Sequence, residues 1–301
     1  MWTATSSASA TSGDVTAQLV TADGLALHLQ PGPPPAGAVR GTVVVVHGLG
    51  EHAGRYAHVL AHLAAHGWAS LAYDQRGHGR SPGPRGGVPQ ADSLLADLGA
   101  VLAHARATRP GPLVLLGHSL GGLLAGRYVA EGLAHPPAPW RQPVDALVMS
   151  SPALDPGMSA VQQLLLAVAA PLAPGVALGN GLQPAWVCSD PAVVAAYVAD
   201  PLVHDRVTPR LVRFIVDAGL LVRQRAPQWA VPTLLLYAGA DRCVAPRGSA
   251  DFAAAAPPAH LQARRYDGMA HEIFNEPDRA RVLADLTDWL ARLPTAARSP
   301  A

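Results

Sequence analysis

The most constraining feature of this sequence is an alternation of short apolar runs with longer segments of helical periodicity. The clearest run, Thr42 to Val46, is a threonine followed by four valines, and it leaves neither face polar, as in a strand buried on both sides of a parallel sheet. Further strands are expected at 68–73, 113–116, 146–149, 233–238 and 261–266, and helices at 56–66, 91–108, 120–133, 248–256 and 279–293. This alternation predicts an α/β fold, in which helices cover both faces of a mostly parallel sheet.

Two segments depart from the alternation. Residues 15–29 alternate loosely around Asp23-Gly24, a pair that favours a type I′ hairpin turn. Residues 151–230 contain helix-like pieces at 160–169, 192–199 and 209–223 but no convincing strand. We expect them to form a helical cap, inserted after the sixth strand, over the sheet edge where ligands bind. The predicted plan is a core of 14–150 and 231–295, the cap, and flexible tails at 1–13 and 296–301.

Composition excludes several classes of function. The 22 basic and 21 acidic residues leave a net charge of +1, which offers no footprint for nucleic acid. All the basic residues are arginine, so lysine Schiff bases and P-loop chemistry are excluded. The two cysteines form no CxxC pair, and no clustered metal-ligand spacing such as HExxH occurs; we therefore expect neither a metal nor a cofactor.

The sequence also bears on location. The polar segment 1–13 does not resemble a signal peptide. The most apolar stretch, 164–178, is interrupted by Pro171 and Pro174, and no uninterrupted run is long enough for a membrane span. We therefore expect a cytoplasmic protein, with peripheral membrane contact as an open alternative.

Ser119 is the predicted nucleophile. It lies in Gly117-His118-Ser119-Leu120-Gly121, which matches G-x-S-x-G and falls between an expected strand and an expected helix. The glycines permit a sharp turn that lifts the serine hydroxyl clear of the backbone. At the start of the helix, backbone N–H groups favour developing negative charge. An N-capping serine is the simpler alternative.

A serine nucleophile needs a base and an acid that orients the base. His271 follows the last expected strand, and Asp241 follows the strand 233–238, which gives the chain order Ser, Asp, His that this motif uses. Asp267 and Glu276 are closer to His271 in sequence, but neither ends the preceding strand. The oxyanion needs two N–H donors, which we expect from Leu120 and, in the glycine loop 47–50, from Leu49.

Six segments of the sequence suggest a family. The segments are HGLGEHAGRY (47–56), DQRGHGRS (74–81), GHSLGG (117–122), DPL (200–202), GADR (239–242) and HEIFNE (271–276). Together they resemble the monoacylglycerol lipase and lysophospholipase branch of the α/β-hydrolases, over nearly all of 15–293. The resemblance implies an α/β-hydrolase fold and a serine esterase with Ser119, Asp241 and His271 as its triad.

The resemblance also implies substrate contacts. Glu51 and Arg55 match a polar pair beside the acyl and glycerol pockets, although an ion pair that braces the loop is the alternative. Tyr197 matches a tyrosine that touches the glycerol hydroxyl, unless it only packs within the cap. The apolar stretch 164–178 matches the cap segment that meets lipid, with buried packing as the alternative.

We expect an esterase acting on a single-chain lipid ester, first of all monoacylglycerol. A lysophospholipase or a short-chain carboxylesterase with the same triad is the alternative. A non-catalytic ligand-binding protein on the same fold is a third hypothesis. The oligomeric state cannot be read from the sequence.

Overall fold

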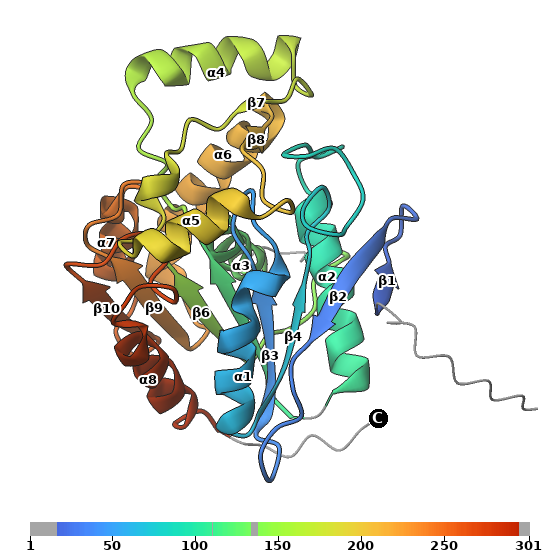
Figure 1. The fold of residues 1–301 in the computed structure, drawn as a ribbon, viewed down its shortest axis with the longest axis vertical. Helices are drawn as coiled ribbons and strands as arrows, with labels where there is room; N and C mark the ends of the chain where they lie inside the picture. Colours follow the sequence, from blue (N-terminus) through green and yellow to red (C-terminus); the bar gives the residue numbers. More distant parts are fainter. Residues whose placement is uncertain (1–16, 110, 134–137, 295–301) are drawn as a thin grey trace, which may run out of the picture.

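The computed structural model describes residues 17–109, 111–133 and 138–294, so the two expected tails lie outside the described residues. Its centre is an eight-stranded sheet in the order β1-β2-β4-β3-β5-β6-β9-β10 (Figure 1). The strands are β1 (Gln18–Val20), β2 (Ala26–Pro31), β3 (Gly41–Val46), β4 (Trp68–Tyr73), β5 (Leu113–His118), β6 (Ala146–Ser150), β9 (Thr233–Ala238) and β10 (Leu261–Tyr266). From β4 to β10 all pairings are parallel, whereas β2 is antiparallel to both β1 and β4.

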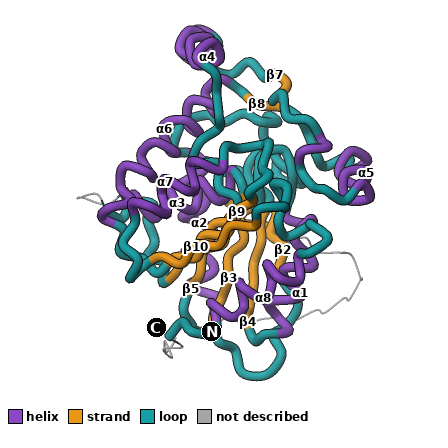
Figure 2. Tube along the Cα trace, turned by 90° about the vertical axis from the view of Figure 1, so that its left-hand side faces the viewer, coloured by secondary structure: helices purple, strands orange, loops and turns teal. Residues whose placement is uncertain are grey.

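Helices cover both faces of the sheet, as the alternation predicts (Figures 1 and 2). One face packs on α1 (Ala57–Ala65) and α8 (Arg279–Leu290). The other packs on α2 (Ser93–Thr108), α3 (Leu120–Glu131), α6 (Pro209–Arg225) and α7 (Pro246–Ala255). The four valines of β3 are at most 1% exposed, and they divide between the two cores because alternate side chains point to opposite faces.

The hairpin forms, but the expected type I′ turn is wrong. Strands β1 and β2 are joined by the loop 21–25, in which Leu25 O accepts a hydrogen bond from Thr21 N–H at 2.9 Å. The Thr21 hydroxyl also accepts from Leu25 N–H at 3.1 Å. Gly24 has a φ of +82° but Asp23 does not have a positive φ, and a type I′ turn requires both.

The segment 151–230 lies above the carboxyl ends of the strands, with α4 (Ala160–Leu172) and α5 (Pro191–Ala199) outermost (Figures 1 and 2). It is not purely helical, because β7 (Leu178–Gly179) pairs antiparallel with β8 (Arg206–Val207). The helix α6 descends from this layer and packs against α3 with Leu211, Phe214 and Ile215 in the core. Pro171 falls in the last turn of α4 and does not interrupt it earlier.

No helix in the described residues is both long and apolar enough to cross a membrane.

Candidate active site

Ser119 occupies the turn between β5 and α3. Its φ of 54° and ψ of −118° are in a region that residues other than glycine rarely adopt. The conformation is fixed by two backbone hydrogen bonds, since Ser119 N–H donates to Ser150 O at 2.9 Å and Ser119 O accepts from Ala153 N–H at 3.0 Å. The sheet and the start of the cap therefore hold the strained turn that a nucleophilic serine requires.

The flanking glycines are needed for close packing rather than for positive φ. A Cβ on Gly117 would lie 2.1 Å from Gly121 O, and a Cβ on Gly121 would lie 2.2 Å from Val46 O. Any side chain at either position would separate α3 from β3 and β5. This geometry explains why the serine is bracketed by glycines.

His271 and Asp241 form a buried hydrogen-bonded pair. His271 Nδ1 lies 2.7 Å from Asp241 Oδ2, and the two side chains are 7% and 2% exposed. Burial alone would lower the pKa of His271, but the charge and the hydrogen bond of Asp241 together raise it above its ordinary value. An imidazole held in this way is poised to accept a proton at Nε2.

The two alternative acids are engaged elsewhere. Glu276 accepts hydrogen bonds from Ser189 N–H at 2.6 Å and from the Ser189 hydroxyl at 2.8 Å. Asp267 is exposed and pairs with Arg265 at 2.8 Å. Only Asp241, of the three acids considered, contacts the imidazole.

The contact between the serine and the histidine is indirect in this structure. Within the described residues, no hydrogen bond joins the Ser119 hydroxyl to His271. The ring of His118, the residue before the serine, packs on the ring of His271 with centroids 4.8 Å apart. Hydrogen bonds of this kind are often long before substrate binds.

The two predicted oxyanion donors lie beside Ser119. Leu49 and Leu120 line one cavity with it. In the part of the chain that the structure describes, neither backbone N–H has a hydrogen-bond acceptor. Two unused amides next to a serine hydroxyl are the arrangement that stabilises a developing oxyanion.

Glu51 and Arg55 form a closed network behind the glycine loop. Glu51 Oε1 accepts from Gly48 N–H at 2.5 Å and from the Tyr56 hydroxyl at 2.7 Å, and Glu51 Oε2 accepts from Arg55 at 2.8 Å. Arg55 also donates to both carboxylate oxygens of Glu272, at 2.5 and 2.7 Å. Burial alone would raise the pKa of Glu51, but Arg55 and these hydrogen bonds hold it below its ordinary value. The contacts support a bracing role.

Tyr197 is not among the residues that line the serine cavity. The guanidinium of Arg55 lies 4.8 Å from the centre of its ring. Its side chain lines a different cavity, of about 280 Å³, with Asp200 and His204. Tyr197 therefore joins the Glu51–Arg55 network from the cap side.

The cavity above Ser119 is mostly apolar. It has a volume of about 530 Å³, and cap residues such as Leu166, Leu182 and Trp186 form much of its wall. Arg242 is the one charged residue among the described residues that line it, and its guanidinium lies 4.9 Å from the centre of the Trp186 ring. A pocket of this composition suits an acyl chain.

Three potential metal-ligand atoms also meet near the histidine. The nearest such atoms of Asp241, Cys243 and His271 lie within 4.8 Å of one another. Asp241 Oδ1 already accepts from Cys243 N–H at 2.8 Å and from Val244 N–H at 3.0 Å. Burial raises the pKa of the Cys243 thiol, which disfavours the thiolate that a metal requires. The donor set suits an acid–base pair better than a metal.

Sequence reasoning missed several residues that complete the site. His118 and Glu272 each lie next to a residue of the predicted site, and His204 lies two residues after the DPL motif. Their roles depend on contacts with distant segments, such as the one between Glu272 and Arg55. The HEIFNE motif was the one signal that could have identified Glu272.

The chain is similar to known hydrolases over most of its length. The profile of the family described as serine aminopeptidase, S33, matches residues 37–278. A monoacylglycerol lipase of Mycolicibacterium smegmatis is 36% identical over 255 residues, which are 83% of this chain and 88% of that protein. Human monoglyceride lipase is 29% identical over 269 residues, 86% and 84% of the two chains. The structure of Paleococcus ferrophilus monoacylglycerol lipase has a TM-score of 0.78 and 32% identity, and covers 89% of this chain and 99% of that one.

Fold and site together define an α/β-hydrolase with a serine elbow. The chain belongs to the serine aminopeptidase S33 family, in its monoacylglycerol lipase and lysophospholipase branch, and is a serine hydrolase of carboxylic esters.

Proposed function

We propose that this protein hydrolyses monoacylglycerol to a fatty acid and glycerol. The observation that carries the proposal is the opening of Ser119 into an apolar cavity of about 530 Å³ roofed by the cap. The cavity provides space for one acyl chain, and the relatives named monoacylglycerol lipase and monoglyceride lipase support the choice of a glycerol ester.

The proposed mechanism has two steps. The Ser119 hydroxyl attacks the ester carbonyl while His271 Nε2 takes its proton, and Asp241 stabilises the resulting imidazolium. The amides of Leu49 and Leu120 hold the oxyanion. As the carbon–oxygen bond of the ester breaks, His271 returns the proton to the glycerol oxygen. His271 then takes a proton from water, whose oxygen attacks the carbonyl carbon of the acyl-enzyme. As the bond to Ser119 Oγ breaks, His271 returns that proton to the serine and the fatty acid is released.

In this mechanism Glu51 and Arg55 act through the loop they hold. Gly48 N–H is fixed by Glu51, and Gly48 immediately precedes Leu49. A shift of the loop would move one oxyanion donor, and small displacements of such donors are costly in rate. Tyr197, stacked on Arg55, extends this brace to the cap.

The cap also offers a surface for a lipid interface. Along α4, Val161, Leu164, Leu165, Val168 and Leu172 are between 53% and 79% exposed. Aliphatic side chains gathered on an outermost helix fit contact with a membrane or micelle surface. We propose that α4 docks there transiently while substrate enters the cavity below it.

One observation favours a second substrate class. The guanidinium of Arg242 lies at the wall of the acyl cavity, and within the described residues no carboxylate pairs with it. An unpaired cation at this place could accept the phosphate of a lysophospholipid. A relative named phospholipase YtpA, from Bacillus subtilis, is 28% identical over 246 residues.

The proposal is tested by measuring fatty-acid release from 1-monooleoylglycerol and lysophosphatidylcholine in parallel, with Ser119→Ala as the blank. Fast, Ser119-dependent release from the glyceride alone supports the proposal. Preference for the phospholipid, lost in Arg242→Gln, would establish the second candidate instead. Absence of Ser119-dependent release from either lipid would contradict both.

A further inference from the structure

Glu272 joins three segments of the chain. It follows His271 directly and is 5% exposed. Its backbone N–H donates to Val187 O in the cap at 2.7 Å. Its carboxylate accepts from both terminal nitrogens of Arg55, at 2.5 and 2.7 Å. A two-point contact of this kind fixes the orientation of both partners as well as their distance.

The turn that carries His271 and Glu272 is held by its own hydrogen bonds. Ile273 N–H donates to His271 O at 3.0 Å, and Asn275 N–H donates to Glu272 O at 2.7 Å. The side-chain amide of Asn275 also donates to Glu272 Oε2 at 2.9 Å. Because these bonds fix the backbone of the turn, a displacement of Glu272 also displaces the imidazole of His271.

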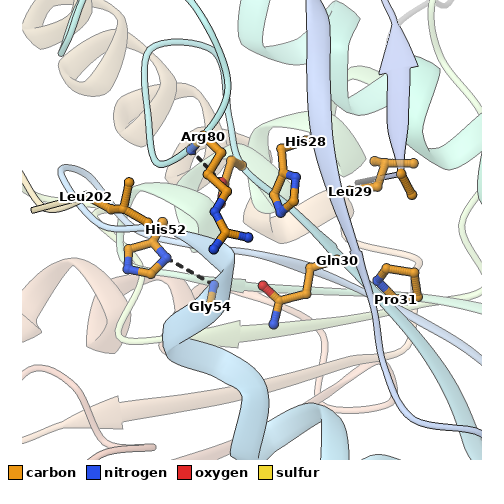
Figure 3. Close-up of a pocket in the computed structure, with 10 residues that line it drawn as sticks. His28, Leu29, Gln30, Pro31, His52, Gly54, Arg80 and Leu202 are labelled. Carbon is orange, nitrogen blue, oxygen red and sulfur yellow. Dashed lines mark hydrogen bonds between the residues drawn. The ribbon is translucent and has the colours of Figure 1, made fainter. Parts of the chain in front are cut away.

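Arg55 is presented to Glu272 by a capped turn. It belongs to the single turn η1 (Ala53–Tyr56). His52 Nδ1 accepts from Gly54 N–H at 3.2 Å, and His52 Nε2 pairs with Asp200 of the cap at 2.8 Å. Figure 3 shows the His52 ring beside Gly54. The segment that carries the guanidinium is therefore held in place on its other side.

From Arg55 the contacts continue to the glycine loop. Arg55 donates to Glu51 Oε2 at 2.8 Å, and Glu51 Oε1 accepts from Gly48 N–H at 2.5 Å. Gly48 precedes Leu49, a proposed oxyanion donor. The side chains of Glu51, Arg55 and Glu272 are between 4% and 11% exposed, and breaking a buried charged contact is costly. A continuous chain of charged hydrogen bonds therefore connects the oxyanion loop with the residue next to the general base.

The charges in this chain favour a protonated His271. Glu51 and Glu272 share one guanidinium, that of Arg55, so these three side chains leave one negative charge unbalanced. Burial lowers the pKa of His271, but Asp241 and, more weakly, Glu272 and Glu51 raise it.

Among the described residues, two further titratable side chains face the imidazole and stay uncharged at neutral pH. His118 packs on the ring of His271, and burial lowers the pKa of His118 to about 3. The ligand atom of Cys243 lies within 4.8 Å of those of Asp241 and His271, and burial raises the pKa of the Cys243 thiol. The charge on His271 is therefore controlled by Asp241 and by the carboxylates that share Arg55.

We propose that Glu272 is a positioning residue for ester hydrolysis by Ser119. Its fork with Arg55 fixes the distance between His271 and the oxyanion loop. Its charge stabilises the imidazolium that forms when His271 takes the serine proton. This role rests on the proposed triad mechanism. It concerns rate rather than substrate binding, because Glu272 is not among the described residues that line the acyl cavity.

The test is the pH dependence of kcat and KM for p-nitrophenyl butyrate, a soluble ester, in the parent and in Glu272→Gln. The glutamine keeps the shape of the side chain but removes its charge. We expect kcat to fall by roughly tenfold, as for a slightly displaced catalytic group, with KM near that of the parent. The acid limb of kcat/KM should move to lower pH by roughly half a pH unit or more. An acid limb at the pH of the parent, whatever the fall in kcat, would reduce Glu272 to a structural support and overturn the proposal.

Glu272→Asp separates position from charge. It keeps the carboxylate but is too short for the fork, so kcat should fall while the acid limb stays in place. Glu276→Gln is the matched control, because Glu276 is also buried and bonds to Ser189 of the cap. It should leave the acid limb in place, with all variants folded by circular dichroism. Identical pH profiles for Glu272→Gln and Glu276→Gln would refute the role of Glu272.

Two further variants keep the result interpretable. If Ser119→Ala retained full activity on this ester, the triad mechanism itself would fail, and the role of Glu272 with it. If Ser119→Ala were inactive but Glu272→Gln hydrolysed the ester like the parent, only the role of Glu272 would fail. Should Glu272→Gln not fold, Glu272→Asp and Arg55→Lys carry the test, because each loses the fork and keeps the charge. An unchanged kcat in both would overturn the proposal.

Discussion

The backbone carbonyl of Gly50 accepts a hydrogen bond from the backbone N–H of His204 at 2.8 Å. Gly50 belongs to the glycine loop that carries Leu49, and His204 belongs to the cap segment after α5. The ring of His204 stacks in turn on His78, with centroids 4.7 Å apart, and His78 lies in the DQRGHGRS motif. The cap and the proposed oxyanion loop are therefore joined by a direct backbone hydrogen bond.

This contact predicts a large effect of Gly50→Ala. Gly50 has a φ of +76°, and a Cβ there would lie 2.2 Å from His204 O. The new methyl group must push the loop and the cap apart, which displaces Leu49. We expect kcat for ester hydrolysis to fall by roughly 10²-fold or more, as when an oxyanion donor is lost.

The matched control is Gly24→Ala. Gly24 has a similar φ of +82°, but nothing lies within 4 Å of the added Cβ. Gly24→Ala should lower the melting temperature, because alanine is strained at a positive φ. Its esterase activity should be unchanged. If the two variants lost activity equally, the contact between Gly50 and His204 would have no special role.

The His271–Asp241 pair predicts the pH dependence. His271 must be neutral to accept a proton, and Asp241 raises its pKa above the ordinary histidine value. The rate should therefore fall as the pH drops through a value above about 6.5. In Asp241→Asn the acid limb should move to lower pH, while kcat/KM falls by roughly 10³- to 10⁴-fold. An acid limb at the same pH in both proteins would mean that another group titrates.

Substitution of Glu51 distinguishes a role in bracing the glycine loop from a role in contacting the substrate. Glu51→Gln removes the charge that pairs with Arg55, and we expect a loss of about 1.5–3 kcal/mol in unfolding free energy, typical of a charged hydrogen bond. If Glu51 braces the loop, hydrolysis of a monoacylglycerol and of the methyl ester of the same acid should fall by the same factor. A loss confined to the glycerol ester would show direct contact with substrate.

Glu131→Gln is the control for that experiment. Glu131 pairs with Arg127 one turn away on α3, and each side chain is 20% exposed. An i, i+4 ion pair on a helix contributes only about 0.2–0.5 kcal/mol. The melting temperature and both rates should therefore remain near those of the parent.

The exposed aliphatic side chains of α4 predict that this helix is needed for hydrolysis of substrate held in a membrane. Leu164 and Leu172 are 67% and 79% exposed, and neither lines the acyl cavity. The double variant Leu164→Asp, Leu172→Asp should slow hydrolysis of monooleoylglycerol in vesicles by roughly 10²-fold or more, because burial of each leucine in lipid contributes about 1.5–3 kcal/mol and each ~1.4 kcal/mol is a factor of ten. Hydrolysis of a soluble short-chain ester should be unaffected. Leu220→Asp, at a 46% exposed leucine on α6, is the control and should leave both rates unchanged.

Much of the fold could be predicted because the local sequence pattern of a segment agrees with the burial of that segment in the folded protein. The valines of β3 are buried on both faces, as their sequence indicates. The positions of Ser119 and Asp241 in the fold could also be predicted. The motif of Ser119 requires a strand on one side and a helix on the other, and Asp241 follows the end of β9.

What could not be predicted depends on contacts between distant segments. No sequence feature near Arg55 indicates that Glu272, 217 residues later, accepts hydrogen bonds from both terminal nitrogens of its guanidinium. The strands β7 and β8 have two residues each and are too short to show a period. The turn at Asp23-Gly24 was mispredicted because the hydrogen bonds between Thr21 and Leu25 stabilise a longer loop.

The proposed mechanism requires that Ser119 is an activated nucleophile. The most direct measurement is mass spectrometry of peptides after treatment with an alkyl fluorophosphonate, with residual esterase activity followed in the same samples. We predict one adduct on Ser119, formed in proportion to the activity lost and absent from His271→Ala. Full activity with Ser119 modified, or inactivation with Ser119 unmodified, would contradict the claim.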